Sequence, residues 1–223
     1  MTNKSRRVVL LTGASSGIGQ ATAELLAARG HRVFGGARSA STTRLLAGVE
    51  PVTLDVREEA SVKACVEDVR SRADRIDVLI NNAGINLVGA VEETSIGQAQ
   101  ALFDTNVIGV LRMIQAVLPG MRGQGAGLIV NISSILGLIP APFMGVYAST
   151  KHAIEGLSES LDHEVRAFGV RVILIEPQTP VAGNPAFSGR VCLGAAFSPD
   201  LSRPLQALQT TRRGRETQRS SLR

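Results

Sequence analysis

The chain has 223 residues, of which 44% are apolar and 19% are charged, and it carries a formal net charge of +5. This length suits one sizeable domain, and no apolar run approaches the roughly 20 residues that a membrane-spanning helix needs. The excess charge lies in residues 181–223, which hold seven arginines against Asp200 and Glu216, so the composition gives no basic domain face of the kind that nucleic acid requires.

The N-terminus and the cysteines indicate where the protein resides. The chain begins with basic residues, but the apolar stretch that follows, Val8–Leu11, is too short for an export signal. The two cysteines, Cys65 and Cys192, form neither a disulfide framework nor a metal-type spacing, and the three histidines are scattered. We therefore expect a cytoplasmic protein without a metal site.

Up to about residue 176 the sequence alternates strand-like and helix-like segments. Short apolar runs predict six strands, at Val8–Thr12, Arg32–Ala37, Pro51–Asp55, Ile76–Ile80, Gly127–Asn131 and Val170–Ile175. Helical spacing predicts helices at Ile18–Arg29, Ser41–Ala47, Glu58–Arg75, Ser95–Leu118 and Tyr147–Phe168. We expect Gly30 and Gly169 to follow the ends of two helices, and Pro119-Gly120 to stop another. The alternation is typical of an α/β domain with a parallel sheet and right-handed crossovers.

A glycine-rich turn, Thr12–Gly19, follows the first strand and opens the first helix. Gly13 allows the tight turn, Gly17 lets the backbone approach a pyrophosphate, and Gly19 lets helix and strand pack closely. The helix N-terminus then offers free N–H groups to phosphate oxygens. A tight turn also needs glycine without any ligand, but the strand and helix on either side favour nucleotide binding.

The end of the second strand indicates which nucleotide is bound. A site that prefers NAD places Asp or Glu here to bind the ribose 2′-hydroxyl, but Val33–Ser39 contains no carboxylate. Arg38 stands where a 2′-phosphate would lie, although an exposed surface arginine would look the same. The missing acid favours NADP(H) over NAD(H).

Tyr147 and Lys151 form the third constellation. Residues four apart lie on one face of a helix, so the ammonium lies near the phenol and should lower its pKa from about 10. An acid or base that works near neutral pH requires such a shift. Most Tyr/Lys pairs on helices are only surface pairs, but Tyr147 is the only tyrosine of the chain.

With these motifs in order, the sequence resembles the short-chain dehydrogenase/reductase family over residues 6 to 177. The T-G-x-x-x-G-x-G motif is Thr12–Gly19, and the N-N-A-G motif is Asn81–Gly84. The Y-x-x-x-K motif runs from Tyr147 to Lys151. The remaining matches are the family's adenine-contacting pair and its active-site asparagine and serine, at Asp55, Val56, Asn106 and Ser134.

The resemblance implies hydride transfer between NADP(H) and a carbonyl or alcohol substrate. Tyr147 would move the proton and Ser134 would bind the same substrate oxygen. Lys151 would bind the nicotinamide ribose and lower the pKa of Tyr147, and Asn106 would hold a water that relays protons. The expected cofactor contacts are Gly13, Ser15, Ser16, Gly17, Ile18, Gly19, Arg38, Asp55, Val56, Asn82, Ala83, Gly84, Tyr147 and Lys151.

The resemblance also implies a Rossmann-type, doubly wound parallel sheet in a single domain, with strand order 3-2-1-4-5-6. The apolar segment Leu138–Val146 would line the substrate's side of the cleft and favours an apolar substrate, although it would also suit packing under a lid. A homodimer would form through the two long helices, Ser95–Leu118 and Tyr147–Phe168.

The family pattern breaks after the sixth strand. Gln178 replaces the glycine of a Pro-Gly turn, and residues 178–223 form an irregular basic tail in which we expect little order and no seventh strand. Three explanations are open. The tail is a frameshift product, or it belongs to a genuine short variant and binds a partner, or the chain is a nucleotide-binding protein without turnover.

Overall fold

The computed structural model describes residues 6–39 and 46–177, which form a six-stranded parallel sheet with helices on both faces. The strands are β1 (Val8–Thr12), β2 (Arg32–Ala37), β3 (Val49–Thr53), β4 (Val78–Asn81), β5 (Gly127–Ile132) and β6 (Val170–Ile175). Their order is β3-β2-β1-β4-β5-β6, and every pairing is parallel. The predicted doubly wound fold and its strand order are confirmed.

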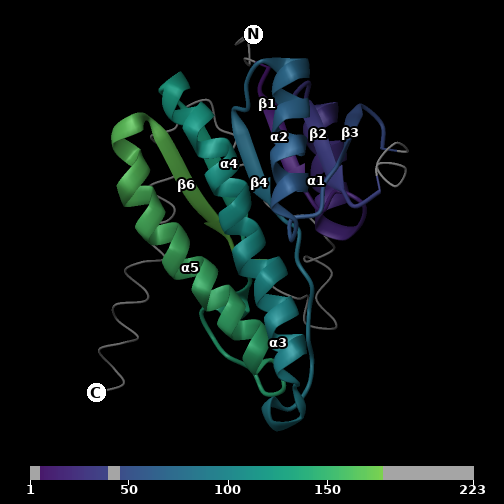
Figure 1. Cartoon of the computed structure of the whole chain (residues 1–223), viewed down its shortest axis with the longest axis vertical. Coiled ribbons are helices and arrows are strands. Elements are labelled where there is room, and N and C mark those ends of the chain that lie inside the picture. Colours follow the sequence, from purple (N-terminus) through teal and green to yellow (C-terminus); the bar gives the residue numbers. More distant parts are fainter. Residues whose placement is uncertain (1–5, 40–45, 178–223) are drawn as a thin grey trace. The chain divides into compact units, whose positions relative to one another are not determined.

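The α-helices are α1 (Gly17–Ala28), α2 (Glu59–Ala73), α3 (Ile96–Phe103), α4 (Gly109–Gln124) and α5 (Gly145–Val165). Shorter turns are the 3₁₀ segments η2 (Val91–Glu93), η4 (Ile135–Gly137) and η5 (Arg166–Phe168), and the π-helical segment η3 (Asp104–Ile108). Figure 1 shows α2, α4 and α5 lying across one face of the sheet. Because the strands are parallel, their carboxyl ends lie at one edge of the sheet, where the segments after β1, β4 and β5 carry predicted motifs.

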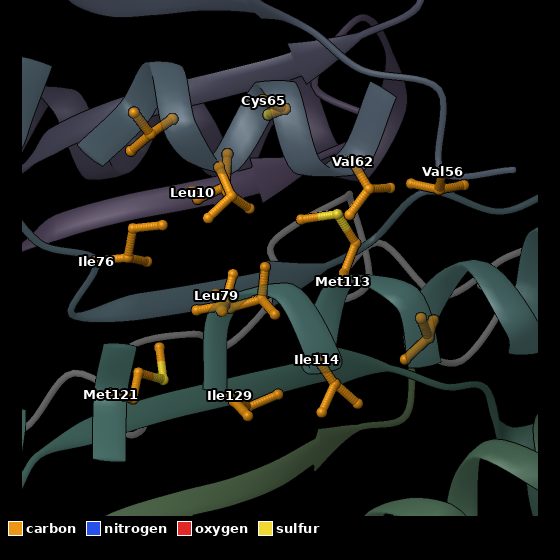
Figure 2. Close-up of a cluster of buried hydrophobic side chains, with 14 of the residues drawn as sticks. Leu10, Val56, Val62, Cys65, Ile76, Leu79, Met113, Ile114, Met121 and Ile129 are labelled. Atoms are coloured by element: carbon orange, nitrogen blue, oxygen red, sulfur yellow. The ribbon is translucent and has the colours of Figure 1, made fainter. Parts of the chain in front are cut away.

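The main core lies between the sheet and these three helices. Leu10, Leu79 and Ile129, from three adjacent strands, meet Cys65 of α2 and Met113 of α4 (Figure 2). Successive side chains of a strand point to opposite faces, and all five residues of β1 are buried, so both faces of that strand are covered. The near-continuous apolar strands follow from this double cover.

The edge strand β3 lies two residues earlier in the chain than predicted. It spans Val49–Thr53 and pairs only with β2, with Pro51 opposite Gly35. Proline lacks the N–H that a central strand needs for pairing on both sides, but an edge strand tolerates it. Pro51 is therefore inside the strand, and Asp55 lies beyond its end, facing the cleft.

The prediction that Pro119-Gly120 stops a helix is wrong. The helix continues to Gln124 and ends at Gly125 in a left-handed conformation, with φ at 65°. An internal proline costs about 3 kcal/mol. Full burial of Met121 beyond it offsets much of that cost, since burying such a side chain contributes roughly 1.5–3 kcal/mol. Packing against the sheet therefore outweighs the local signal.

This helical run, Ile96–Gln124, is also the one part of the described chain that is long and apolar enough to cross a membrane. By itself this is weak evidence, because the core helix of a soluble protein meets the same criteria. Here the apolar residues of α4 (Val110, Met113, Ile114, Val117 and Met121) belong to the main core. Packing on the sheet therefore accounts for these residues of α4.

Other helix ends agree with the sequence. Gly30 follows α1 with φ at 87°, and its N–H donates to the carbonyl of Ala27. Gly169 follows η5 with φ at 72°. The helix predicted at Ser41–Ala47 falls largely outside the described residues, as do the predicted basic tail, the absent seventh strand and Cys192.

Candidate active site

The glycine-rich turn between β1 and α1 has the geometry that its three glycines predict. Gly13 and Gly17 have positive φ angles of 69° and 56°, which side chains disfavour. A Cβ on Gly13 would lie 2.8 Å from Cα of Ala83. A Cβ on Gly19 would collide with the carbonyl oxygen of Gly13 and with Nδ2 of Asn82. A Cβ on Gly17, by contrast, would have no atom within 4 Å. The turn is close-packed on the protein side and open where a ligand would lie.

Asn82 ties this turn to the end of β4. Its Nδ2 donates to the carbonyls of Thr12 and Gly13 at 3.1 and 3.0 Å. The hydroxyl of Thr12 accepts in return from the backbone N–H groups of Asn82 and Ala83, at 3.0 and 2.9 Å. Two motifs some 70 residues apart thus hold each other through four hydrogen bonds. The predicted Asn82 and Ala83 therefore fix the turn as well as lining the cleft.

A cleft of about 590 Å³ runs from this turn along the carboxyl ends of β1, β2 and β3. Eleven predicted cofactor residues line it: Gly13, Ser15, Ser16, Ile18, Gly19, Arg38, Asp55, Val56, Asn82, Ala83 and Gly84. Gly17 is adjacent in the turn but is not among the lining residues. The structure thus brings the predicted nucleotide-binding residues together along one cleft.

Arg57, at the far end of this cleft, was not predicted as a site residue. Its guanidinium donates to both carboxylate oxygens of Asp55, at 3.0 and 2.6 Å, and its backbone N–H donates to the same carboxylate. These bonds, with a smaller effect of the Arg38 charge, lower the pKa of Asp55 to about 2. The only sequence signal was its position two residues after Asp55. This end of the cleft therefore carries two cations beside one firmly ionised carboxylate.

A second pocket adjoins the first at the carboxyl ends of β4 and β5. It is lined by Ile18, Asn82, Gly84, Ile85, Asn86, Ile132, Ser133, Ser134, Tyr147, Lys151 and Pro177. Ile18, Asn82, Gly84 and Ile85 line both pockets. One continuous cleft therefore joins the glycine-rich turn to the predicted reactive side chains.

Lys151 is almost fully buried at this pocket. It is 8% exposed, its Nζ donates to the carbonyl of Ile132 at 2.9 Å, and it stands 5.7 Å from the centre of the Tyr147 ring. Burial disfavours the ammonium and lowers the pKa of Lys151 to about 8, against the opposing effect of Glu155. Lys151 thus titrates within reach of neutral pH.

The pKa of Tyr147 moves in the opposite direction to the one predicted. Burial is the main cause and raises it above 10, while a hydrogen bond with Ser134 lowers it by less. The Lys151 ammonium, whose Nζ donates to the carbonyl of Ile132, does not offset this effect of burial. The expected lowering of the Tyr147 pKa by Lys151 is therefore corrected, and the phenol is protonated at neutral pH.

Ser134 lies at the start of the turn η4, directly after β5. Its hydroxyl accepts from the N–H of Leu136 at 3.2 Å and hydrogen-bonds Tyr147. The N–H of Ser133 donates to the carbonyl of Ile175 at 2.7 Å, which anchors the turn to β6. The predicted proton donor, Tyr147 of α5, and the predicted oxygen-binding residue, Ser134 at the start of η4, thus meet.

Asn106 lies in η3 and is 2% exposed. Its Oδ1 accepts from the N–H of Ile85, and its Nδ2 donates to the carbonyl of Ile85 and to Oγ1 of Thr150. Both amide hydrogens are therefore used within the protein, and Asn106 lines neither pocket. It links the loop after β4 to α5. Its predicted role of holding a water stays a prediction.

No three His, Cys, Asp or Glu side chains gather into a possible metal site within residues 6–39 and 46–177. Cys65 is buried against the core, and its burial raises its thiol pKa to about 12.

The family model for short chain dehydrogenases matches residues 7–182. The 3-ketodihydrosphingosine reductase of Bacteroides thetaiotaomicron is 42% identical over 171 residues, which cover 77% of this chain and 63% of that protein. The chain thus spans less than two thirds of the length of this relative.

Two solved structures show the same fold at appreciable identity. A short-chain dehydrogenase from Streptomyces avermitilis is 38% identical with a TM-score of 0.74, covering 86% of this chain and 75% of that one. A metagenomic short-chain oxidoreductase in complex with NADP is 32% identical with a TM-score of 0.73, covering 77% and 81%. The similarity therefore extends from sequence to structure.

Proposed function

Since the chain belongs to the short-chain dehydrogenase/reductase family, as its motifs indicated, we propose that it transfers a hydride between NADP(H) and a carbonyl or alcohol substrate. The observation that carries this proposal is the continuous cleft. It joins a phosphate-binding turn, through Ile18 and Asn82, to a pocket that holds Ser134, Tyr147 and Lys151.

The cleft suits a dinucleotide. The N-cap residue of α1, Ser16, makes no side-chain capping bond, and the first turn of α1 carries no acidic residue. The N–H groups of that turn and the partial positive charge of the helix therefore face the open space beside Gly17, where a pyrophosphate would lie. The metagenomic relative is described in complex with NADP, which supports a nicotinamide dinucleotide here.

The far end of the cleft supports NADP(H) over NAD(H). A 2′-phosphate would lie beside Arg38 and near Arg57, and guanidinium groups bind phosphate through charged, often bidentate hydrogen bonds. The one carboxylate there, Asp55, is occupied by Arg57 and follows β3 rather than β2. We assign Arg38 the leading role in this preference.

In the reaction that we propose, the nicotinamide supplies or accepts the hydride. The raised pKa of Tyr147 keeps its hydroxyl protonated, so it donates a proton to the carbonyl oxygen during reduction. Ser134 donates a hydrogen bond to the same oxygen and stabilises the developing charge. Lys151 binds the nicotinamide ribose, and Asn106 holds the loop after β4 in place.

The surroundings of the reaction pocket favour an apolar substrate. Ile139 is 57% exposed and Phe143 65% exposed on the loop between η4 and α5, and Ile85 is exposed on the facing loop. The carbonyl of Phe143 accepts from the N–H of Gly89, which joins the two loops beside the pocket. The Bacteroides relative is named as a reductase of a 3-keto compound, which supports carbonyl reduction.

Fluorescence titration with NADPH, followed by a screen of apolar ketones for NADPH oxidation, tests the proposal. We expect binding and turnover together. Binding without oxidation of NADPH by any ketone in the screen would leave nucleotide binding alone as the function.

We further propose a cytoplasmic homodimer that pairs through α4 and α5. The mass of the protein in solution tests whether it is a dimer.

A further inference from the structure

Helix α5 carries a buried polar stripe that extends beyond the residues assigned above. Tyr147, Lys151 and Glu155 are spaced four residues apart and so share one face of the helix. Lys151 is 8% exposed and Glu155 is 7% exposed. A buried carboxylate therefore lies one turn behind the lysine that lines the reaction pocket.

The turn η4 packs directly onto this carboxylate. A Cβ on Gly137 would lie 3.0 Å from Oε1 of Glu155 and 2.8 Å from Oγ of Ser133. A side chain at position 137 would require Ser133 and Glu155 to shift. Since η4 begins directly after Ser134, the Glu155 carboxylate contacts the turn that carries the serine of the proposed reaction and lies one helical turn from its lysine.

Glu155 is the opposite charge that acts on Lys151, because the elements packed against this face supply no other. The segments β5, η4 and α3 contain no charged residue. The charged residues of η3, η5 and β6 form ion pairs elsewhere: Asp104 with Arg112, Arg166 with Asp162, and Arg171 with Asp162. Glu176 lies beyond the end of β6.

We propose that Glu155 is a positioning residue that keeps Lys151 protonated in the hydride transfer proposed above, on which this inference rests. In a site with little water, an opposite charge favours the ammonium while burial opposes it. The pKa of Lys151 is already lowered to about 8, so the lysine has little reserve near neutral pH. Without Glu155 the neutral amine predominates at neutral pH, and the charged hydrogen bonds that Lys151 offers to the nicotinamide ribose are lost.

The protonation of Lys151 can be measured without turnover. Competitive labelling with acetic anhydride across a pH series, followed by peptide mass spectrometry, gives the titration midpoint of this one lysine. Glu155→Gln should lower that midpoint by about one pH unit or more. Glu159→Gln, which removes the same charge at an exposed position one turn further along α5, should leave it unchanged.

Two further variants keep the test decisive. Glu155→Met removes the charge with an apolar chain of similar length and replaces Glu155→Gln if that variant does not fold. Glu155→Asp retains the charge and should restore a midpoint near that of the wild type. Unchanged midpoints in the Gln and Met variants would overturn the proposal.

The pH dependence of catalysis provides a separate readout. In the wild type, NADPH-dependent reduction should slow as the pH rises through about 8, because the Lys151 ammonium is lost. Glu155→Gln should move this decline to lower pH. A wild-type chain that reduces no carbonyl would refute the proposed function, yet the labelling experiment would still decide whether Glu155 sets the charge of Lys151.

Discussion

The cofactor end of the cleft is made mostly of backbone and exposed arginines, whereas its reaction end is made of side chains that the protein buries. At the first end, a glycine-rich turn is held by Asn82 and flanked by Arg38 and Arg57. At the second, Lys151 and Asn106 are each less than 10% exposed and bond to neighbouring backbone.

This difference decides how charge behaves at each end. The pKa of Asp55 falls to about 2 because Arg57 lies against it in partial contact with solvent. At the reaction end, burial dominates, lowering the pKa of Lys151 and raising that of Tyr147. Ion pairing therefore fixes protonation where phosphate would bind, whereas at the reaction end burial favours the neutral forms of both Lys151 and Tyr147.

The largest effect that we predict comes from the reaction end. Tyr147→Phe should lower the rate of carbonyl reduction by about 10²–10⁴-fold, the usual contribution of a general acid. NADPH affinity should stay within about twofold of the wild type, because the phenol lies away from the phosphate turn. Stopped-flow or steady-state NADPH oxidation, together with a fluorescence titration, measures both. Wild-type rates in the mutant would refute the mechanism.

The next effect should come from the backbone of the cofactor end. Gly19→Ala places a Cβ against the carbonyl of Gly13 and the side chain of Asn82, so the turn must move. We expect a loss of about 1–3 kcal/mol in the free energy of unfolding and weaker NADPH binding. Gly156→Ala is the control, because it meets no neighbour within 4 Å in α5 and should stabilise the protein by about 0.5–1 kcal/mol. Urea denaturation compares the two.

The local signals predicted most of the fold and of the cofactor end. Strand positions and the tight turn at Gly13 depend on backbone rules that act over a few residues, whereas the strand order was an implication of the family resemblance. The prediction that Pro119 ends the helix was wrong because the burial of Met121 on the sheet, a tertiary contact, outweighs the local cost of the proline. Sequence rules therefore fail where long-range packing reverses a local preference.

The reaction end shows the same limit in its electrostatics. The spacing of Tyr147 and Lys151 predicted that they share a helix face, which the structure bears out. It also predicted a lowered Tyr147 pKa, and this failed because the spacing does not reveal burial, which raises that pKa. Glu155 was overlooked for the same reason, since only the depth of α5 distinguishes it from an exposed glutamate such as Glu159.

Arg38→Asp tests the charge of the cofactor end. The substitution removes a guanidinium and places a carboxylate where a ribose 2′-hydroxyl would lie. We expect NADPH affinity to fall by about ten- to hundredfold, the cost of losing a charged hydrogen bond, while NADH affinity rises. Kd values for both nucleotides, measured in parallel, give the ratio. An unchanged ratio would remove Arg38 from the binding of the 2′-phosphate.

The smallest effect should come from Arg57→Gln, which separates two roles for this arginine. Its side chain is 45% exposed, so its loss should weaken NADPH binding by only a few-fold, in line with an exposed charge pair. If its charge acts on the 2′-phosphate, NADH affinity should not change, and this is the result that we expect. Equal losses for both nucleotides would mean that Arg57 acts only by holding Asp55.

Because Arg57 is the main cause of the low Asp55 pKa, the variant should also raise that pKa from about 2 toward its usual value. Titration of the Asp55 carboxyl by NMR would show this shift even if neither affinity changed.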